Sequence, residues 1–345
     1  MATITIVGAG VMGSAMAFPS RENGHEVRLV GTHLDREIID TCLKTNRHPK
    51  YDIDFPEGVS FHQIEEVEEA LKGADVVVCG VSSFGVDWFG ENIIPLIKED
   101  QPILSITKGL IDTPEGKLLT FPQYWSKMTD KKLCINAVGG PCICFDMAWH
   151  DHTVVSFCGP DMKILTWLKE IFSRDYYHIS LTSDVTGIET AVALKNGFAL
   201  AVATTIGLLE RRTSGDQKKR LNCEAGAFGQ ALKEATNVLR FQGADRLENQ
   251  VVFAGDLYVT VYGGRSRRAG VLLGKGLDIH ETRKELNGVT LESLVIIERV
   301  ARAIRYNVEK DILDPKDFPL LLHIDDVITR KKEVCIPWEG FTYED

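Results

Sequence analysis

Residues 3–13 read Thr3-Ile4-Thr5-Ile6-Val7-Gly8-Ala9-Gly10-Val11-Met12-Gly13, and this run is the strongest indication of the fold class. Its first five residues are all β-branched and predict a strand. The residues beyond the last glycine, including Ala15, Met16 and Phe18, predict a helix. The glycine pattern G-x-G-x-x-G therefore lies in a turn between a strand and a helix.

That context gives each glycine of the pattern a physical role. The first allows a tight turn, the second lets a pyrophosphate approach the backbone, and the third lets the helix pack on the sheet. Free N–H groups at the start of the helix would bind the anion. We therefore predict a dinucleotide site at Gly8, Gly10, Val11, Met12 and Gly13.

Short apolar runs and helical patterns alternate over the first half of the chain. Strands are predicted at 3–7, 26–30, 75–81, 102–106, 133–138, 153–157 and 178–181, and helices at 35–43, 64–71 and 85–97. Apolar strands that alternate with helices are typical of a parallel sheet covered on both faces. The predicted fold class is α/β, with a Rossmann-type, doubly wound and mainly parallel sheet over residues 1–183.

From residue 184 onward, helical periodicity replaces the strands. Helices are predicted at 186–211, 224–239, 291–306 and 319–327, and only the segment near Val251 has a weak strand signal. Thr186 and Glu189 have the spacing of a capping box at the start of the first helix. Residues 184–345 are therefore predicted to form an all-helical C-terminal domain.

The net charge and the cysteine content limit the partners, the metal sites and the cellular location that are expected for this protein. The 345 residues carry a net charge of −10, which argues against nucleic acid as a partner. The eight cysteines show no CxxC pair and no Cys/His ladder, so we expect reduced thiols, a cytoplasmic location and no metal site. The start of the chain lacks signal-peptide features. The apolar stretch from Gly197 to Leu209 is shorter than the ~20 residues of a membrane span, so no membrane partner is expected.

The end of the second predicted strand bears on which dinucleotide binds. Proteins that bind NAD usually have an acidic residue there, about 20 residues after the glycines. Here the sequence reads Leu29-Val30-Gly31-Thr32-His33-Leu34-Asp35-Arg36, with no acid at the strand tip and Asp35 late enough to cap the next helix. Thr32, His33 and Arg36 could receive a 2′-phosphate. The sequence therefore favours NADP, with NAD as the alternative.

Two lysines lie at positions that suggest ligand binding or proton transfer. Lys108 follows an apolar strand, at the edge where doubly wound sheets bind ligands, although a solvated loop lysine is an equal alternative. Lys195 lies in an apolar helical segment with Val192 and Phe198 as near neighbours. Burial disfavours the ammonium and would permit proton transfer near neutral pH. A lysine whose stem merely covers apolar surface is the alternative.

The densest polar cluster is the run Gly255-Asp256-Leu257-Tyr258-Val259-Thr260-Val261-Tyr262-Gly263-Gly264-Arg265-Ser266-Arg267-Arg268. If this stretch is helical, Asp256 and Thr260 share one face. The forked guanidinium of Arg265 and the hydroxyl of Ser266 suit a phosphate. A basic cluster in an acidic chain favours an anionic ligand, and a solvated basic turn is the alternative.

In this order, the motifs resemble those of the NAD(P)-dependent glycerol-3-phosphate dehydrogenase family, in its bacterial and archaeal form. The likeness runs over nearly the whole chain and is carried by GAGVMG at 8–13, TKGL at 107–110, GGP at 139–141, ALKNG at 193–197, GDLYVTVYGGRSR at 255–267 and LLGKG at 272–276. It implies an oxidoreductase that reversibly reduces dihydroxyacetone phosphate to sn-glycerol 3-phosphate by hydride transfer.

The resemblance also implies residue roles, with residues 184–345 as the substrate-binding and catalytic domain. Lys195 would be the general acid and base, and Lys108 and Asp256 would be the other catalytic residues. Substrate-binding residues would be Lys108, Gly140, Cys142, Asn196, Asp256, Thr260, Arg265 and Ser266. Besides the glycine motif and the candidates His33 and Arg36 after the second strand, the cofactor-binding residues would be Lys108, Cys144, Arg265 and Glu292.

Three departures from the family pattern leave the substrate open. Ser266 replaces the usual Asn, the loop after Pro141 reads Cys142-Ile143-Cys144, and Asp146 stands where Glu is expected. A longer polyol phosphate is therefore the alternative substrate. A non-catalytic dinucleotide sensor is a less favoured alternative, and the quaternary structure we expect is a homodimer.

Overall fold

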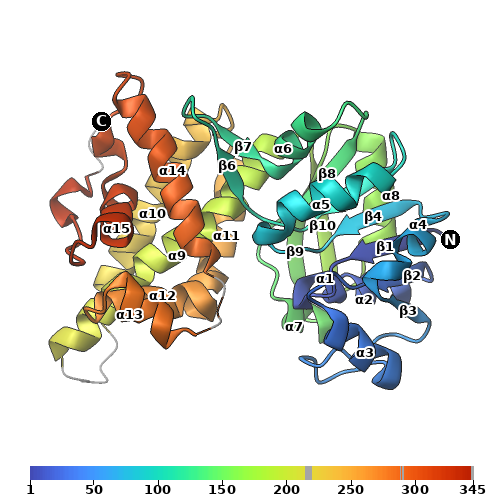
Figure 1. Cartoon of the computed structure of the whole chain (residues 1–345). Coiled ribbons are helices and arrows are strands. Elements are labelled where there is room, and N and C mark those ends of the chain that lie inside the picture. Colours follow the sequence, from blue (N-terminus) through green and yellow to red (C-terminus); the bar gives the residue numbers. More distant parts are fainter. Residues whose placement is uncertain (214–219, 288, 290, 343–345) are drawn as a thin grey trace. The chain divides into compact units, whose positions relative to one another are not determined.

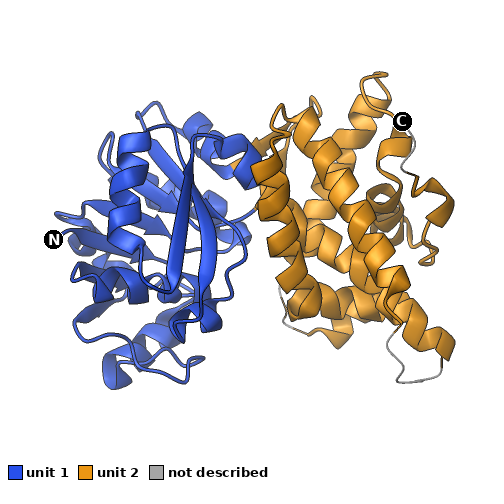
Figure 2. Cartoon of the chain, turned by 180° about the vertical axis from the view of Figure 1, so that it is seen from behind, with its two compact units in different colours: residues 1–108, 121–189 blue, residues 109–120, 190–345 orange. Residues whose placement is uncertain are grey.

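The computed structural model describes residues 1–213, 220–287, 289 and 291–342 (Figure 1). The chain divides into two compact units (Figure 2): unit 1 comprises residues 1–108 and 121–189, and unit 2 comprises residues 109–120 and 190–345. Unit 1 contains an eight-stranded sheet, and the described part of unit 2 is helical apart from one β-hairpin.

The sheet of unit 1 has the strand order β10-β9-β8-β5-β4-β1-β2-β3. Its strands are β1 (Thr3–Val7), β2 (Glu26–Val30), β3 (Val59–His62), β4 (Val76–Cys79), β5 (Pro102–Ser105), β8 (Cys134–Gly139), β9 (Thr153–Cys158) and β10 (Tyr177–Thr182). Neighbouring strands are parallel except for β8 and β9. The strand order reverses at β1, which lies between β2 and β4, and this is where doubly wound sheets bind dinucleotides. The predicted mainly parallel, doubly wound sheet is confirmed.

The helices and short 3-10 turns of unit 1 connect these strands. They are α1 (Val11–Ala15), α2 (Ala17–Glu22), α3 (Arg36–Thr45), η1 (Ile64–Glu66), α4 (Val67–Leu71), η2 (Ser83–Gly85), α5 (Val86–Asn92), η3 (Ile94–Leu96), α6 (Phe121–Met128), α7 (Cys144–Ala148) and α8 (Met162–Phe172). Helix α2 packs on β2, α3 on β3, and α8 on β9 and β10 (Figure 1). Strand β3 is not predicted from the sequence, because its residues Ser60 and His62 dilute the apolar signal of a strand.

The helix after the glycine turn is interrupted. It consists of α1 and α2 with a break at Met16. Pro19 has no N–H to donate to the carbonyl of Ala15, four residues earlier, so the regular hydrogen-bond ladder cannot continue there.

The β-hairpin of β6 (Leu110–Asp112) and β7 (Leu118–Thr120) belongs to unit 2, although its residues lie between two segments of unit 1. Leu110 and Leu118 are buried in the apolar core of the helical unit. Arg302 donates to both carboxylate oxygens of Asp112, at 2.7 and 3.0 Å. The structure therefore differs from the division at 183/184 in two ways, because the hairpin joins the helices and the second boundary falls after Glu189.

The helical unit is built from seven longer helices among the described residues. They are α9 (Val185–Thr213), which begins in unit 1, α10 (Asn222–Phe241), α11 (Leu247–Tyr262), α12 (Gly264–Gly274), α13 (Ile279–Glu285), α14 (Glu292–Val308) and α15 (Pro319–Arg330), with 3-10 turns η4 (Pro315–Asp317) and η5 (Trp338–Gly340). The weak strand signal near Val251 is wrong. That residue lies in α11, whose buried residues include Phe253, Leu257 and Val261 at helical spacing.

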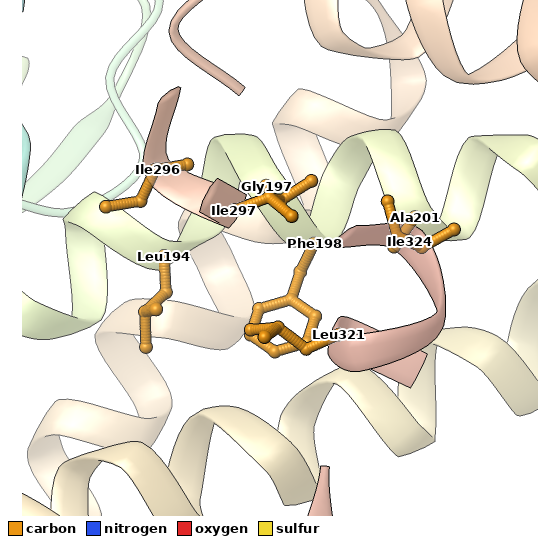
Figure 3. A pocket seen from close by; sticks show the side chains of 8 residues that line it. All are labelled: Leu194, Gly197, Phe198, Ala201, Ile296, Ile297, Leu321 and Ile324. Carbon is orange, nitrogen blue, oxygen red and sulfur yellow. The ribbon is translucent and has the colours of Figure 1, made fainter. Parts of the chain in front are cut away.

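The core of unit 2 lies around α9. Figure 3 shows apolar side chains from α9, α14 and α15 around a cavity of about 10 Å³, too small for a ligand. By length and composition α9 could cross a membrane, but 72% of an apolar 18-residue stretch of this helix is buried inside the protein. A helix that is apolar on most sides and buried is expected at the centre of a helical domain.

Glycines allow α9 and α12 to pack closely. A Cβ atom at Gly270 would lie 2.2 Å from the carbonyl oxygen of Leu200, and one at Gly207 would lie 2.1 Å from that of Val271. A larger residue at either position would force the two helices apart. This close packing fixes the helix that carries Lys195 against the helix that carries Arg265.

Candidate active site

The turn after β1 has the geometry that a dinucleotide site requires. Gly8 has a φ of +112°, and a Cβ there would lie 2.6 Å from the carbonyl carbon of Gly80. A Cβ at Gly13 would lie 2.1 Å from the carbonyl oxygen of Gly8. Gly10 differs, because a Cβ there would meet no described atom within 4 Å. The turn is thus packed at its first and third glycines and open at the second, where a pyrophosphate would approach.

Two side chains that no sequence motif marks contact the backbone of this turn. A ring nitrogen of His48 lies 3.1 Å from the carbonyl oxygen of Ala9, and the Tyr51 hydroxyl donates to the carbonyl of Val11. Burial lowers the pKa of His48, so its imidazole is neutral at neutral pH. Both residues come from the loop after α3, and no local spacing in the sequence relates that loop to the glycine turn.

Asp35 reaches the tips of β1 and β2, contrary to the prediction that no acid stands there. Its Oδ2 accepts hydrogen bonds from the Ala9 N–H at 3.2 Å and from the N–H and hydroxyl of Thr32, both at 2.8 Å. Its side chain does not cap α3, although Asp35 occupies the N-cap position. The acid is found five residues beyond the strand end because the chain turns back there.

Of the other residues predicted to favour NADP, His33 and Arg36 lie on the surface of unit 1 and Thr32 does not. His33 is exposed and its ring centroid is 5.7 Å from that of Trp88. Arg36 is about half exposed and donates to Glu65 at 2.5 Å. Thr32 is buried, and its hydroxyl is used by Asp35. Arg36 is therefore the cation of this group best able to bind a 2′-phosphate. Its ion pair with Glu65 is exposed, so little free energy is needed to break it.

Lys108 and Gly140 come together at the carboxyl edge of the sheet. The Lys108 ammonium donates to the Gly140 carbonyl at 3.3 Å, and Gly140 has a φ of +127° that favours glycine. Cys142 follows on the same loop and Cys144 is the first residue of α7, and both are half-buried. Burial raises the pKa of the Cys144 thiol, so it is protonated at neutral pH.

Glu189 is a buried acid near Lys108. It is fully buried, and neither of its carboxylate oxygens has a hydrogen-bond partner among the described residues. Burial raises its pKa to about 8, and the positive charge of Lys108 opposes that rise. The capping-box prediction is wrong, since Asp184 caps α9 by accepting the Gly187 N–H at 2.9 Å. The sequence does contain a signal for this buried acid, because Glu189 stands within the otherwise apolar segment that follows Thr186.

In unit 2, Lys195 forms an ion pair with Asp256. The ammonium donates to Oδ1 of Asp256, whose side chain is fully buried, while the Lys195 side chain is 13% exposed. The neighbours Val192 and Phe198 are buried, as the apolar spacing predicts. Neither alternative from the sequence describes Lys195 fully. Its ammonium is not isolated in an apolar environment and does not extend to the surface, because it is paired with the buried carboxylate of Asp256.

The cluster after Gly255 is helical, and it divides between two helices. Asp256 and Thr260 lie one turn apart on α11, and the Thr260 hydroxyl donates to the Asp256 carbonyl at 2.6 Å. Gly264 has a φ of +89° and starts α12, which carries Arg265 and Ser266 in its first turn. Arg265 is about half exposed and Ser266 is buried.

Glu292 connects two of the predicted binding residues. Its Oε2 accepts a hydrogen bond from the Asn196 amide at 3.4 Å and lies 3.9 Å from Nη2 of Arg265. Asn196 stands next to Lys195 on α9, and Glu292 is the first residue of α14. Unit 2 thus combines a buried ion pair able to move a proton with a nearby forked cation suited to phosphate.

The predicted residues therefore form two sets. Unit 1 contains the glycine turn, the contact of Lys108 with Gly140, and the two cysteines. In unit 2, hydrogen bonds and ion pairs connect Lys195 with Asp256 and Thr260, and Asn196 with Glu292 and Arg265. Within the described ranges, no group of three or more His, Cys, Asp or Glu side chains is arranged to hold a metal ion.

Solved structures of known enzymes share this fold over nearly the whole chain. Glycerol-3-phosphate dehydrogenase of Coxiella burnetii aligns with a TM-score of 0.80 and 22% identity, over 99% of this chain and 97% of that one. The Plasmodium falciparum enzyme aligns with a TM-score of 0.82 and 19% identity, over 96% and 92%. These likenesses establish the shared fold.

Sequence comparison is more specific. The chain is 34% identical over 320 residues to NADP(+)-dependent glycerol-3-phosphate dehydrogenase of Archaeoglobus fulgidus, covering 90% of this chain and 92% of that protein. It is 27% identical over 299 residues to the NAD(P)+ enzyme of Shouchella clausii, covering 85% and 84%. The models for the N- and C-terminal parts of NAD-dependent glycerol-3-phosphate dehydrogenase match residues 3–164 and 184–336. The chain therefore belongs to the NAD-dependent glycerol-3-phosphate dehydrogenase family.

Proposed function

We propose that this protein catalyses the reversible NAD(P)-dependent reduction of dihydroxyacetone phosphate to sn-glycerol 3-phosphate. The observation that carries the proposal is the ion pair of Lys195 with the buried Asp256, in the same unit as Arg265. Proton transfer to a carbonyl oxygen and phosphate recognition are the two tasks that this substrate demands. Membership of the family supplies the reaction type.

Lys195 is proposed as the proton donor. Its ammonium carries the proton that the substrate oxygen needs as the carbonyl is reduced, and it recovers that proton in the reverse reaction. Asp256 orients the ammonium and compensates its charge in a site that is largely closed to water. The bound dinucleotide supplies or accepts the hydride. A preorganised cation at the developing alkoxide lowers the barrier in either direction.

Arg265 is proposed as the main phosphate ligand. Its guanidinium can form two parallel hydrogen bonds to phosphate oxygens. Glu292 lies beside both Arg265 and Asn196, and so can hold these side chains in position before the substrate binds. Ser266 adds a hydroxyl group that can donate to a substrate oxygen, and the Thr260 hydroxyl, whose hydrogen is donated to the Asp256 carbonyl, can accept a hydrogen bond from a substrate hydroxyl.

The residues of unit 1 are proposed to bind the dinucleotide. The open position at Gly10 fits a pyrophosphate, while Gly8 and Gly13 give the turn its shape. Lys108 and Gly140 lie at the carboxyl edge of the sheet, where the reactive end of the cofactor is bound in doubly wound folds. Cys142 is assigned to the substrate and Cys144 to the cofactor. NADP is the preferred cofactor, with Arg36 and His33 at the 2′-phosphate.

The same proposal includes a cytoplasmic location and a homodimer. All eight cysteines are free thiols, which suits a reducing compartment.

The proposal is tested by following reduced-cofactor absorbance with NADPH or NADH and ketose phosphates of three to five carbons. Turnover of dihydroxyacetone phosphate with the highest kcat/KM is the expected result. Preference for a longer ketose phosphate would transfer the assignment to that substrate. Dinucleotide binding without turnover of any ketose phosphate would identify a sensor instead.

A further inference from the structure

Glu189 is a fully buried acid that the proposed mechanism does not use. It lies in the first turns of α9, and neither of its carboxyl oxygens has a hydrogen-bond partner among the described residues. Buried polar groups are nearly always hydrogen-bonded, and an exception calls for a specific reason. A methionine would fill a similar space without the cost of burying a polar group, so packing alone does not explain the acid.

A second buried acid of this protein shows the arrangement that a structural role produces. Glu234 is also fully buried, but it accepts hydrogen bonds from the N–H groups of Leu320 at 2.7 Å and Leu321 at 2.8 Å, and from the amide of Gln230 at 2.8 Å. These bonds join α10 to the start of α15. Glu189 has no such bonds, so it does not connect elements in this way.

Glu189 lies over a row of small side chains on one face of the sheet. The row consists of residues that pair in register across four strands, namely Cys79 of β4, Ser105 of β5, Ala137 of β8 and Cys158 of β9. Burial raises the pKa of both thiols, and the charge of Glu189 raises it further. Because these thiols stand at opposite ends of the row, the acid lies between them, where the short side chains leave room for it.

Lys108 follows β5 and is close enough to Glu189 for their charges to interact. Burial raises the pKa of Glu189, and the positive charge of Lys108 opposes that rise. The Lys108 ammonium donates to the Gly140 carbonyl at 3.3 Å, at the carboxyl edge of the sheet. Glu189 therefore lies behind a cation that is placed at the ligand-binding edge.

Three other titratable groups lie in this region of unit 1. Cys79 and Cys158 stay uncharged at neutral pH, because burial raises the pKa of both thiols. Asp184 acts on Cys158 as well, and its carboxylate accepts the Gly187 N–H at 2.9 Å at the start of α9. Lys108 is thus the cation through which an ionised Glu189 would affect a ligand.

We propose that Glu189 is a positioning residue that acts on the substrate through Lys108. While its carboxyl group is neutral, the Lys108 ammonium presents its full charge to the anionic substrate, and an ionised carboxylate attracts and offsets that charge. The inference rests on the proposed function, because it takes Lys108 as a ligand of a phosphorylated substrate. Charges in an interior of low dielectric constant act on one another strongly, so the effect does not require a direct contact.

The consequence is a substrate affinity that falls when the acid ionises. Burial raises the pKa of Glu189 to about 8, so its carboxyl group is mostly neutral at pH 7 and mostly ionised at pH 9. KM for dihydroxyacetone phosphate should rise about tenfold between these values, the loss that corresponds to one pKa unit. The change should fall on KM rather than on kcat, because the proposed proton donor is Lys195, which belongs to unit 2.

The first test compares KM at pH 7 and at pH 9 in wild type, Glu189→Gln and Glu189→Met. Neither replacement can ionise, so the ratio of the two KM values should fall from about ten to below about two. Glu170→Gln, which removes an exposed acid of the same unit, is the matched control and should keep the wild-type ratio. Ionisation of the substrate and of other groups affects all four proteins alike. The methionine variant serves if the glutamine variant does not fold.

A second test does not depend on turnover. Trace labelling with acetic anhydride, followed by mass spectrometry, measures the pH at which the Lys108 amine becomes half reactive. A nearby carboxylate holds the ammonium in its charged form, so this midpoint should lie about 1 pH unit lower in Glu189→Gln than in wild type. The exposed Lys98 of the same unit is the internal control, and its midpoint should be equal in the two proteins.

The proposal is overturned if both Glu189 variants keep the wild-type ratio of KM values, or if the Lys108 midpoint is the same in Glu189→Gln as in wild type. A wild type that turns over no ketose phosphate would instead contradict the proposed function. In that case the labelling midpoint still decides whether Glu189 acts on Lys108.

Discussion

Lys195 donates a hydrogen bond to Asp256, a carboxylate with no exposed surface, across 61 residues of sequence. Burying a charge pair has a desolvation cost, so a pair of this kind gives weak evidence for stability. It gives better evidence for a function that needs a cation at a fixed place. In the mechanism that we propose, that place is where the substrate carbonyl receives its proton.

Lys195→Ala should lower kcat by about 10² to 10⁴, the usual contribution of a general acid or base. Dinucleotide affinity, measured by fluorescence titration, should change little, because the cofactor turn belongs to unit 1. Lys275→Ala is the control, since that lysine is also ion-paired, at 2.7 Å with Glu210, but is more exposed. A Lys195 variant with near wild-type kcat would remove the residue from the mechanism.

Arg265→Ala should raise KM for dihydroxyacetone phosphate at least tenfold, because a charge-assisted hydrogen bond contributes about 1.5–3 kcal/mol. Ser266→Ala should have a smaller effect, since a water can replace a hydroxyl with little loss. Steady-state KM values for both variants, with Arg268→Ala as the control, check this order.

Ser266→Asn tests the substrate directly. It restores the residue usual in the family, so KM for dihydroxyacetone phosphate should stay equal or fall. If this change abolishes turnover of the true substrate, Ser266 makes room for a larger one, and a longer polyol phosphate becomes the better assignment.

Arg36→Ala should reduce kcat/KM for NADPH about tenfold and leave that for NADH nearly unchanged, because only NADPH has a 2′-phosphate for the guanidinium to bind. Arg47→Ala is the matched control, since Arg47 is also about half exposed and pairs with one acid, Asp54, at 2.7 Å. His33→Glu should move preference toward NADH. Equal or better kcat/KM of the wild type with NADH would contradict the predicted preference for NADPH.

Glu189 should make stability depend on pH. Burial raises its pKa from 4.5 to about 8, so between these values the folded protein binds more protons at this site than the unfolded chain. The free energy of unfolding should therefore fall as pH rises through this range, by up to about 1.4 kcal/mol per pH unit, and the contribution should level off above pH 8.

Urea unfolding of wild type and Glu189→Gln at several pH values measures this contribution. The variant cannot ionise, so its curve should be less steep between pH 5 and 8. Glu170→Gln, a change at an exposed acid of the same unit, should follow the wild type. Parallel curves for wild type and Glu189→Gln would show that the acid is not held protonated by burial.

The features that could be predicted from the sequence are those formed by residues close together along the chain. The β-branched run and three glycines define a strand, a turn and a helix within 13 residues, because each glycine answers a steric demand of its immediate neighbours. The spacing of Asp256 and Thr260 likewise depends only on a helix forming, and the burial of α9 follows from its apolar sides.

Tertiary structure decided the contacts between distant segments. Periodicity shows which face of a helix is apolar, but it does not identify the segment that packs on it. For this reason the sequence could not place hairpin β6–β7 in the helical unit, where Leu110 is buried, or bring the Asp35 carboxylate to the N–H of Ala9. It could not join Asn196 to Glu292 across 96 residues either. Such pairings depend on how whole elements bury apolar surface against one another, and that is settled only when the chain is compact.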